Sequence, residues 1–314
     1  MNSAAEFAGL DCAALPPRPV HLAIGMFDGV HRGHRTVIEA AVTSARQAGG
    51  VAAVLTFFPH PSAIFRRDDC TQLILPAAAK RRVLETLGVE AIITEPFTPE
   101  FSQIPAEEFL PLLRAKLPRL AGIYVGENWR FGRGRRGDAA LLVREGRAGG
   151  ISVFTAARVS WDGKPISSTR IRSLLVKGDV AAANKLLGYA YFAEGVVKPG
   201  KRLGRQLGFP TLNLDWAPEC RPALGVYAVE VRGIDGRDRR NAVANFGLRP
   251  TVEPGATEPR LEVHVLGDCP FGEGDALLVD WRQFLRPEVR FAGVEQLQAQ
   301  IARDRDAAAA FFAR

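Results

Sequence analysis

The sequence lacks the features that mark secreted, membrane-spanning or repetitive proteins. Its four cysteines show neither the paired spacing of a metal site nor that of a disulfide framework: Cys12, Cys70, Cys220 and Cys269. No apolar run approaches the roughly 20 residues that cross a bilayer, and Met1–Pro17 has no basic start of a secretory signal. Internal repeats and low-complexity segments are also missing. These absences predict reduced thiols and a soluble, cytoplasmic protein.

What the sequence does contain is the composition of a folded globular protein. Hydrophobic residues make up 47% of the 314 residues and charged residues 24%, enough for two domains with their own cores. The net charge of +7 admits a polyanionic partner. Two short basic clusters contain glycine, Arg130–Arg136 and Lys198–Arg205. Such clusters suit small phosphorylated ligands better than a long nucleic-acid duplex.

In the first half, apolar runs that predict strands alternate with amphipathic stretches that predict helices. The predicted strands are His21–Gly25, Val51–Phe57, Ala91–Thr94 and Gly122–Gly126. The predicted helices are Thr36–Ala48, Ala77–Thr86, Ala106–Lys116, Ser168–Lys177 and Val180–Leu187. This alternation predicts an α/β domain with a parallel sheet and a ligand at the carboxyl ends of its strands.

After about Gly188 the pattern changes to short β-rich runs separated by turn residues. These runs are Tyr191–Val197, Gly225–Val231, Asn241–Asn245, Arg260–Leu266 and Ala276–Phe284, with an amphipathic helix over Val294–Phe312. The spacing predicts a small antiparallel barrel or sandwich closed by a C-terminal helix. We therefore predict two domains, residues 1–187 and 188–314.

The string Gly25-Met-Phe-Asp-Gly-Val-His-Arg-Gly-His34 lies between the first predicted strand and the first predicted helix. A helix N-terminus presents unpaired N–H groups and a partial positive charge, which favour phosphate. His31 and His34 could donate hydrogen bonds to phosphate oxygens during nucleotidyl transfer. Two histidines at this spacing also occur by chance, and without a third ligand they do not predict a zinc site.

Two further strings in the first half combine basic, aromatic and hydroxyl side chains. Val125–Asp138 contains four arginines with Trp129 and Phe131, which suits a planar phosphorylated ligand but also a solvated basic turn. Ile166–Arg172 places serine hydroxyls before a helix, which suits a phosphate site but also an ordinary N-cap. The three strings together are more specific than any one of them.

In order and spacing these strings resemble the FMN adenylyltransferase module of the bifunctional bacterial riboflavin kinase/FAD synthetases, over roughly residues 20 to 180. Thr56–Pro61 and Phe97–Phe109 match as well, although Phe58 stands where many relatives carry an acidic residue. The resemblance implies a Rossmann-like nucleotidyltransferase domain in which the FMN phosphate attacks the α-phosphorus of ATP, with Mg²⁺ present. It assigns catalysis or ATP and FMN binding to Gly25, Phe27, Asp28, His31, His34, Asn128, Arg130, Ser168, Thr169 and Arg172.

In the second half, Gly200-Lys-Arg-Leu-Gly-Arg-Gln-Leu-Gly-Phe-Pro-Thr-Leu-Asn213 joins a basic glycine loop to a strand without Walker spacing. It predicts a phosphate-binding loop, with Thr211 and Asn213 on one strand face as oxygen ligands for a hard cation. Downstream, Glu262 and His264 share the face of another predicted strand. Glu262 is a candidate general base for a hydroxyl nucleophile, although a strand face in water gives the same pattern.

These residues resemble the riboflavin kinase module, over residues 188 to about 305, with further matches at Gly225–Tyr227, Asn245–Thr251 and Phe284–Glu288. Departures are Pro199, Leu212, Leu248 and the turn Cys269–Gly274. The resemblance implies a six-stranded barrel in which Glu262 takes the proton of the riboflavin 5′-hydroxyl as it attacks the γ-phosphate. It assigns ATP or flavin binding to Lys201, Arg205, Gly208, Pro210, Thr211, Asn213 and Arg286, with Mg²⁺ held by Thr211 and Asn213.

The sequence therefore predicts a bifunctional enzyme that makes FMN from riboflavin and FAD from FMN, using ATP and Mg²⁺. The predicted partners are these small molecules, with no nucleic acid or membrane, and the oligomeric state is open. One alternative is that a single module works and the other is a flavin-binding relic. Another is a nucleic-acid-binding or flavin-sensing regulator, but the sequence shows no helix-turn-helix or RNA-binding signature.

Overall fold

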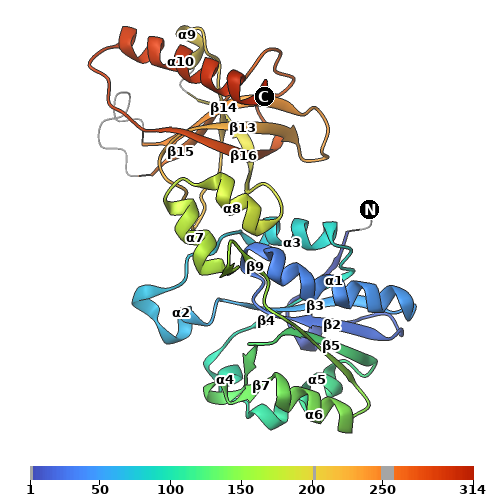
Figure 1. Cartoon of the computed structure of the whole chain (residues 1–314). Helices are drawn as coiled ribbons and strands as arrows, with labels where there is room; N and C mark the ends of the chain where they lie inside the picture. The colour runs from blue at the N-terminus through green and yellow to red at the C-terminus, as the bar shows by residue number, and fades with distance from the viewer. Residues whose placement is uncertain (1–2, 201–202, 249–257) are drawn as a thin grey trace. The chain divides into compact units, whose positions relative to one another are not determined.

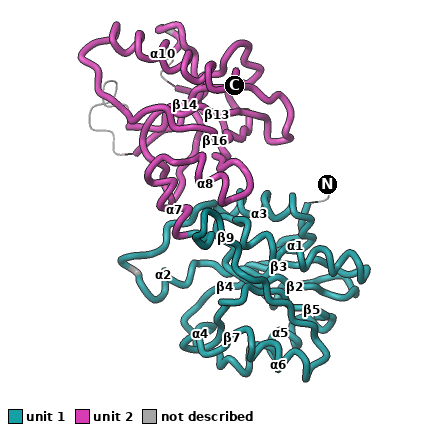
Figure 2. The backbone as a smooth tube through the Cα atoms, in the orientation of Figure 1, with its two compact units in different colours: residues 1–168 teal, residues 169–314 magenta. Residues whose placement is uncertain are grey.

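The computed structural model describes residues 3–200, 203–248 and 258–314 (Figure 1). The chain forms two compact units, Met1–Ser168 and Thr169–Arg314 (Figure 2). Nearly all of α7 (Ser168–Val176) and the whole of α8 (Val180–Leu187) belong to the second unit, where α8 packs on a barrel strand. Within the described residues, no helix combines the length and the apolar character that crossing a membrane requires.

A parallel sheet of six strands forms the centre of the first unit. In spatial order the strands are β1 (Ala5–Phe7), β4 (Ala91–Pro96), β3 (Val51–Phe58), β2 (Val20–Ile24), β5 (Leu120–Gly126) and β8 (Ser152–Ala156). Almost every residue of β2 and β3 is buried, as expected for parallel strands covered on both faces. The chain proceeds from β2 to β3 and β4 on one side and then continues with β5 on the other. Ligands of such sheets bind at the carboxyl ends of the strands beside this reversal.

The helices of the first unit connect and cover these strands. They are α1 (Arg32–Gln47), α2 (Ser62–Phe65), α3 (Ala77–Thr86), α4 (Pro99–Ser102), α5 (Ala106–Lys116) and α6 (Ala139–Ala148). Two hairpins are formed by β6 (Arg130–Phe131) with β7 (Gly137–Asp138), and by β9 (Ser160–Trp161) with β10 (Lys164–Pro165). The sequence pattern placed α3 and α5 with these bounds. It missed β1, β8 and α6, and it began α1 four residues late because His31 is the N-cap of this helix.

A closed antiparallel barrel forms the centre of the second unit and confirms the predicted six-stranded fold. Its order is β11 (Phe192–Lys198), β12 (Leu212–Leu214), β15 (Arg260–Val265), β14 (Arg240–Gly247), β13 (Gly225–Gly233) and β16 (Ala276–Pro287). Aromatic rings pack against one another in its core: Tyr191, Trp216, Tyr227, Phe246 and Trp281. The final helix, α10 (Val294–Phe312), contacts β13 and β14 and buries Ala308.

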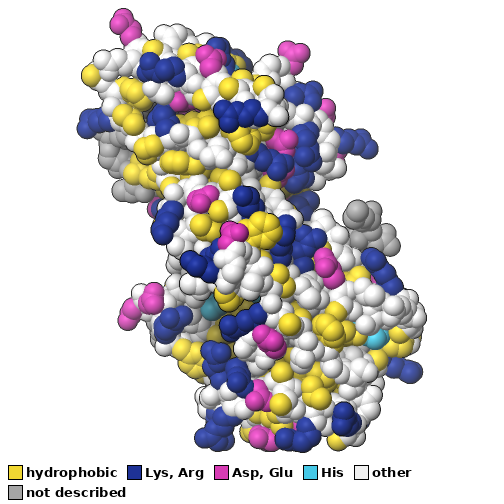
Figure 3. Space-filling view, viewed as in Figure 1, with side chains coloured by type: hydrophobic (Ala, Val, Ile, Leu, Met, Phe, Trp, Pro, Cys, Tyr) yellow, Lys and Arg dark blue, Asp and Glu magenta, His cyan; other side chains and the backbone are white. Residues whose placement is uncertain are grey.

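Basic side chains are spread over both units on the face shown in Figure 3, with acidic side chains among them. On this face the positive charge is therefore dispersed among acidic side chains. Within the described residues, basic side chains of both units form ion pairs, such as Arg130 with Asp138 at 2.9 Å and Arg232 with Asp280 at 3.0 Å.

Candidate functional site

The turn between β2 and α1 carries the first predicted string, at the carboxyl end of β2. Phe27 and Val30 have φ angles of 48° and 37°, a conformation that costs about 1–3 kcal/mol for each such residue. Phe27 is buried and its ring meets that of His34 edge-on, with centroids 5.5 Å apart. A Cβ atom at Gly25 would lie 3.0 Å from the Phe27 ring. Packing thus maintains a strained turn, a feature that is common at binding sites.

Three hydrogen bonds from distant segments hold this turn. The backbone N–H of Ile74 donates to the Asp28 carboxylate at 2.8 Å, and the Ser168 hydroxyl donates to the Asp28 carbonyl at 2.9 Å. The Thr56 hydroxyl donates to the Met26 carbonyl at 3.1 Å. The structure therefore brings Ser168, from the third string, to the centre of the first string.

His31 and His34 stack on each other, with ring centroids 3.5 Å apart. The Nδ1 atom of His31 accepts a hydrogen bond from the backbone N–H of His34 at 3.3 Å, so the neutral ring carries its proton on Nε2 and can donate from there. Burial lowers the pKa of His31 to about 4. Burial, with the nearby charges of His31 and Lys80, lowers the pKa of His34 well below its ordinary value. Both rings are therefore neutral at neutral pH.

One basic residue near this turn, Lys80, could not be predicted from the sequence motifs. The ammonium group of Lys80, on α3, donates to the Thr56 hydroxyl at 3.1 Å. Burial lowers the pKa of Lys80, and the negative charge of Asp28 opposes this shift. The available sequence signal is helical spacing, because Lys80 precedes the buried Val83 and Leu84 by three and four residues. A lysine on the apolar side of a helix is uncommon.

A cavity of about 1070 Å³ opens at the carboxyl ends of β3, β4 and β5, with Met26 of the turn among its lining residues. Seven aromatic residues line it: Phe57, Phe65, Phe97, Phe101, Phe109, Trp129 and Phe131. Four arginines line it as well: Arg66, Arg130, Arg133 and Arg135. This combination accommodates a planar apolar ring that carries an anionic group.

Two predicted residues, Asn128 and Arg130, lie at this cavity. Arg130 pairs with Asp138 across the β6–β7 hairpin at 2.9 Å, and Asp138 in turn caps α6. The Asn128 amide donates to the Glu127 carboxylate at 3.3 Å. Arg130 is thus held in place by Asp138, which belongs to the same sequence string, whereas Asn128 is exposed at the cavity.

The remaining predicted residues of the third string, Thr169 and Arg172, lie in the second compact unit. The Arg172 guanidinium donates to the Thr169 hydroxyl at 3.3 Å, one turn apart on α7. Their role in nucleotide binding stays a prediction.

On the barrel, the predicted hydroxyl, amide and carboxylate groups come together on two adjacent strands. Asn213 of β12 lies directly opposite Glu262 of β15. The Thr211 hydroxyl lies 3.5 Å from the Glu262 carboxylate. His264, next on the same face of β15, donates from Nδ1 to the Pro210 carbonyl at 2.8 Å and so fixes the chain just before Thr211.

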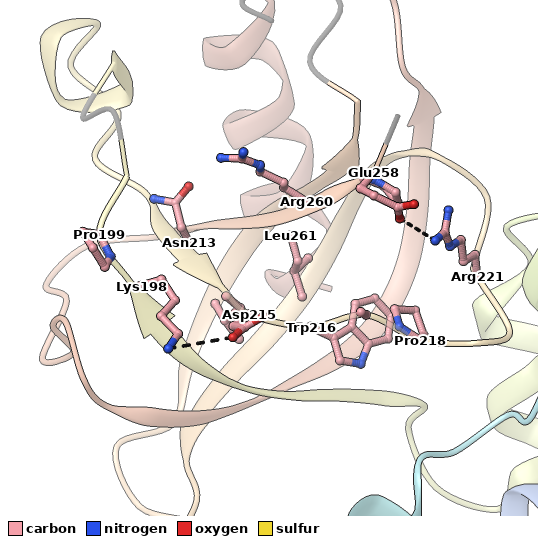
Figure 4. Close-up of a pocket in the computed structure, with 13 residues that line it drawn as sticks. Lys198, Pro199, Asn213, Asp215, Trp216, Pro218, Arg221, Glu258, Arg260 and Leu261 are labelled. Atoms are coloured by element: carbon pink, nitrogen blue, oxygen red, sulfur yellow. Dashed lines mark hydrogen bonds and ion pairs between the residues drawn. The ribbon is translucent and has the colours of Figure 1, made fainter. Parts of the chain in front are cut away.

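Two hollows share Asn213 as a lining residue. The first, of about 390 Å³, is lined by the glycine loop and the turn after β15, including Gly200, Arg205, Pro210, Thr211, Cys269 and Phe271. The second, of about 510 Å³, contains the ion pairs Lys198–Asp215 at 3.8 Å and Arg221–Glu258 at 2.5 Å (Figure 4). A Cβ atom at Gly200 would collide with the Asn213 amide, so the backbone at Gly200 passes directly over this side chain.

For three other residues that were predicted to act in the kinase reaction, the structure gives different kinds of information. Gly208 adopts a left-handed conformation with φ of 85°, just after α9 (Leu203–Gln206). Arg286 is anchored to the C-terminal helix, because its guanidinium donates to both carboxylate oxygens of Asp304 at 2.8 and 2.6 Å. Lys201 lies outside the described residues, as does the Asn245–Thr251 motif beyond Leu248.

No group of three or more His, Cys, Asp or Glu side chains within the described residues is placed to hold a metal ion. Thr211 and Asn213 offer neutral oxygen ligands beside Glu262. These residues fit Mg²⁺, which usually keeps several waters and takes much of its shell from substrate phosphates.

Comparisons with known proteins divide the chain in the same order. The FAD synthetase family model matches residues 15–170 and the riboflavin kinase family model residues 187–312. The bifunctional riboflavin kinase/FMN adenylyltransferase of Escherichia coli K12 is 37% identical over 291 residues, which cover 93% of this chain and 92% of the relative. The protein of that name from Bacillus subtilis is 34% identical, again over 93% and 92%. The crystal structure of a macrolide-efflux protein from Streptococcus pneumoniae aligns with 98% of this chain and 99% of its own, with a TM-score of 0.84 and 27% identity.

Proposed function

The chain belongs to the family of bifunctional riboflavin kinase/FMN adenylyltransferases, and from this premise we propose how its residues share the two reactions. The enzyme phosphorylates riboflavin with ATP to give FMN and joins FMN to the AMP part of ATP to give FAD and pyrophosphate. The functional division that we propose is residues 1–187 for FAD synthesis and 188–314 for riboflavin phosphorylation. It keeps α7 and α8 with the first reaction because Ser168, at the start of α7, hydrogen-bonds to the turn between β2 and α1, which we call the nucleotide turn.

The turn between β2 and α1 binds the ATP phosphates in this proposal. The observation that carries the assignment is the pair of neutral, stacked histidines at the N-terminus of α1, in which His31 has its Nε2–H available to donate. Neutral donors and a helix N-terminus stabilise the charge that builds on phosphate oxygens, and they take no proton in the process. Gly25, Phe27 and Asp28 maintain the turn that aims these donors.

The aromatic cavity binds FMN in this proposal. Its rings can stack on the planar isoalloxazine system, while Asn128 and Arg130 hold the phosphate that attacks the α-phosphorus of ATP. The cavity shares Met26 with the nucleotide turn, which supports an approach of the two substrates at that point. Orientation of both substrates then supplies much of the rate enhancement.

The outer face of the barrel carries the kinase reaction. The glycine loop over Asn213 and the smaller hollow bind ATP, with Arg205, Gly208 and Pro210 among the loop residues. Thr211 and Asn213 would hold the Mg²⁺ that arrives with ATP, and the ion would balance phosphate charge. Glu262 takes the proton from the riboflavin 5′-hydroxyl. We also propose that Lys201 binds phosphate and that Arg286 binds the flavin.

One incubation tests this proposal. Full-length protein is mixed with riboflavin, ATP and MgCl₂, and the flavins are separated by chromatography over time. FMN appearing first and FAD following would support both sites, and a chelator should stop both reactions if Mg²⁺ is required. FMN alone would contradict the assignment of the first unit. No conversion would contradict both assignments and favour a flavin-sensing role.

A further inference from the structure

Lys80 occupies an unusual position for a lysine. It lies on the side of α3 that carries the buried residues Val83 and Leu84, and it is itself half-buried. Its ammonium group donates to the hydroxyl of Thr56, a residue with no exposed surface. Burying a cation is unfavourable unless it is matched by nearby negative charge or hydrogen bonds. The surroundings of Lys80 must therefore offset this cost.

The surroundings of this ammonium group are those of the nucleotide turn. Thr56, which accepts from Lys80, itself donates to the carbonyl of Met26 in the turn. The positive charge of Lys80 contributes to the lowered pKa of His34, and the negative charge of Asp28 acts on Lys80 in the opposite sense. The ammonium group therefore lies one side chain away from the turn, within electrostatic reach of both Asp28 and His34.

The nucleotide turn needs a cation that its own string does not provide. His31 and His34 are neutral at neutral pH, since burial lowers the pKa of each. The two arginines of the same stretch have partners elsewhere: Arg32 lies over the Trp161 ring at 5.0 Å, and Arg35 pairs with Glu39 at 3.3 Å. Pyrophosphate leaves with several negative charges, and neutral donors alone stabilise it less well than charge-assisted hydrogen bonds. Lys80 is a cation from a distant part of the sequence that is held beside the turn.

We infer that Lys80 is a phosphate-binding residue of the FAD-forming site, whose ammonium group contacts the ATP phosphates and stabilises the departing pyrophosphate. An oxygen of the FMN phosphate forms a bond to the α-phosphorus of ATP. The bond from that phosphorus to the oxygen bridging the α- and β-phosphates breaks, and pyrophosphate keeps the electron pair. An ammonium group has three N–H donors and Thr56 uses one, which leaves two for phosphate oxygens. This role rests on the proposed assignment of FAD synthesis to the first unit.

The test compares Lys80→Met, which keeps the length and apolar stem of the side chain, with Lys80→Arg, which keeps the charge. FAD synthesis is measured from supplied FMN and ATP with the full-length protein. For Lys80→Met we expect kcat/KM for ATP to fall about 100-fold, a loss typical of removing one group that stabilises transition-state charge. The KM for FMN should stay unchanged, and Lys80→Arg should recover part of the loss. Lys116→Met, on the exposed end of α5, is the matched control and should behave like the wild type.

Two internal readouts separate a phosphate-binding role from a structural one. Riboflavin phosphorylation by the same preparation should be unchanged, because Lys80 lies in the first unit. The first unit should unfold at the same or a higher temperature in Lys80→Met, because a methionine buries the same stem without a charge to desolvate. If kcat/KM for ATP fell equally in both Lys80 variants and the first unit unfolded at a lower temperature, Lys80 would only stabilise the turn. That result would overturn the inference. Wild-type kcat/KM in Lys80→Met would also overturn it. A wild-type protein that makes no FAD from FMN would instead contradict the proposed function.

Discussion

The two candidate sites use charge in opposite ways. In the first unit His31 is buried and His34 half-buried, and the two stacked rings are neutral, within a turn held by hydrogen bonds from three distant segments. On the barrel, Glu262 lies on β15, with Thr211 and Asn213 as near neighbours on a partly exposed face. FAD formation requires positioned donors and no acceptor for a proton, whereas a hydroxyl nucleophile must lose its proton. The difference in burial thus matches the difference in chemistry.

The sharpest way to separate the sites is to remove the proton acceptor that we propose for the kinase reaction. Glu262→Gln keeps the shape and hydrogen-bonding capacity of the side chain but cannot accept the proton of the riboflavin hydroxyl. We expect riboflavin phosphorylation to fall about 10³-fold, within the range for general-base residues. FAD synthesis from supplied FMN should be unchanged, as measured by chromatography of the flavins. Glu295→Gln, an exposed residue in the first turn of α10, is the control. Loss of both activities in a folded Glu262→Gln protein would contradict two independent sites.

The converse change removes a donor from the first site. His31→Asn retains a side chain that can cap α1 but loses the Nε2–H that we assign to the ATP phosphates. We expect FAD synthesis to fall about 100-fold, the usual effect of losing one such donor. Riboflavin phosphorylation measured on the same sample should be unaffected. FAD formed at the wild-type rate would refute the role of His31.

Elements with strong periodicity and clear ends could be predicted from the sequence. The bounds of α3, α5, α8 and α10 agree with the pattern because apolar spacing defines each helix, with Gly88 and Gly188 after α3 and α8. The short edge strands β1 and β8 were missed, because most of their residues are exposed and apolar patterning is weak. The helix α6 was missed because it follows directly on an arginine-rich string.

The site was only partly predictable for a different reason. Each sequence motif identifies residues within its own segment, such as His31 or Thr211. The contacts between distant segments depend on tertiary packing and cannot be predicted from the motifs. The hydrogen bond from Ser168 to the turn joins residues 140 positions apart, and that from Lys80 joins residues 24 positions apart. Helical spacing could have indicated that Lys80 lies on the inner side of α3, but not what it faces.

The burial of His31 also predicts how the free energy of unfolding of the first unit depends on pH. Folded His31 stays neutral down to a pKa of about 4, whereas in the unfolded chain its pKa returns to the ordinary value of 6.5. Below pH 6.5 the unfolded state therefore binds more protons, so the free energy of unfolding falls as the pH drops toward 4. For His31 we expect a loss of about 2 kcal/mol between about pH 7.5 and about pH 5.

Urea unfolding of the full-length protein at the two pH values measures this loss. In His31→Asn the decrease should be smaller by the contribution of His31, and the transition that this variant shifts belongs to the first unit. His34 should still weaken the variant in acid, since its lowered pKa acts in the same direction. An equal pH dependence in the variant and the wild type would contradict a neutral, buried His31.

The smallest predicted effect is that of replacing Trp129, and it tests whether the two reactions have separate flavin sites. Trp129 lines the aromatic cavity of the first unit and stacks on Phe131, with ring centroids 4.6 Å apart. Aromatic stacking contributes about 0.5–1.5 kcal/mol beyond burial, so Trp129→Ala should raise the KM for FMN about tenfold, while Trp129→Phe should raise it less. The KM for ATP in FAD synthesis and the KM for riboflavin in the kinase reaction should stay at wild-type values. A matching rise in the KM for riboflavin would mean that one flavin pocket serves both reactions, and burial could then no longer explain the contrast between the two sites.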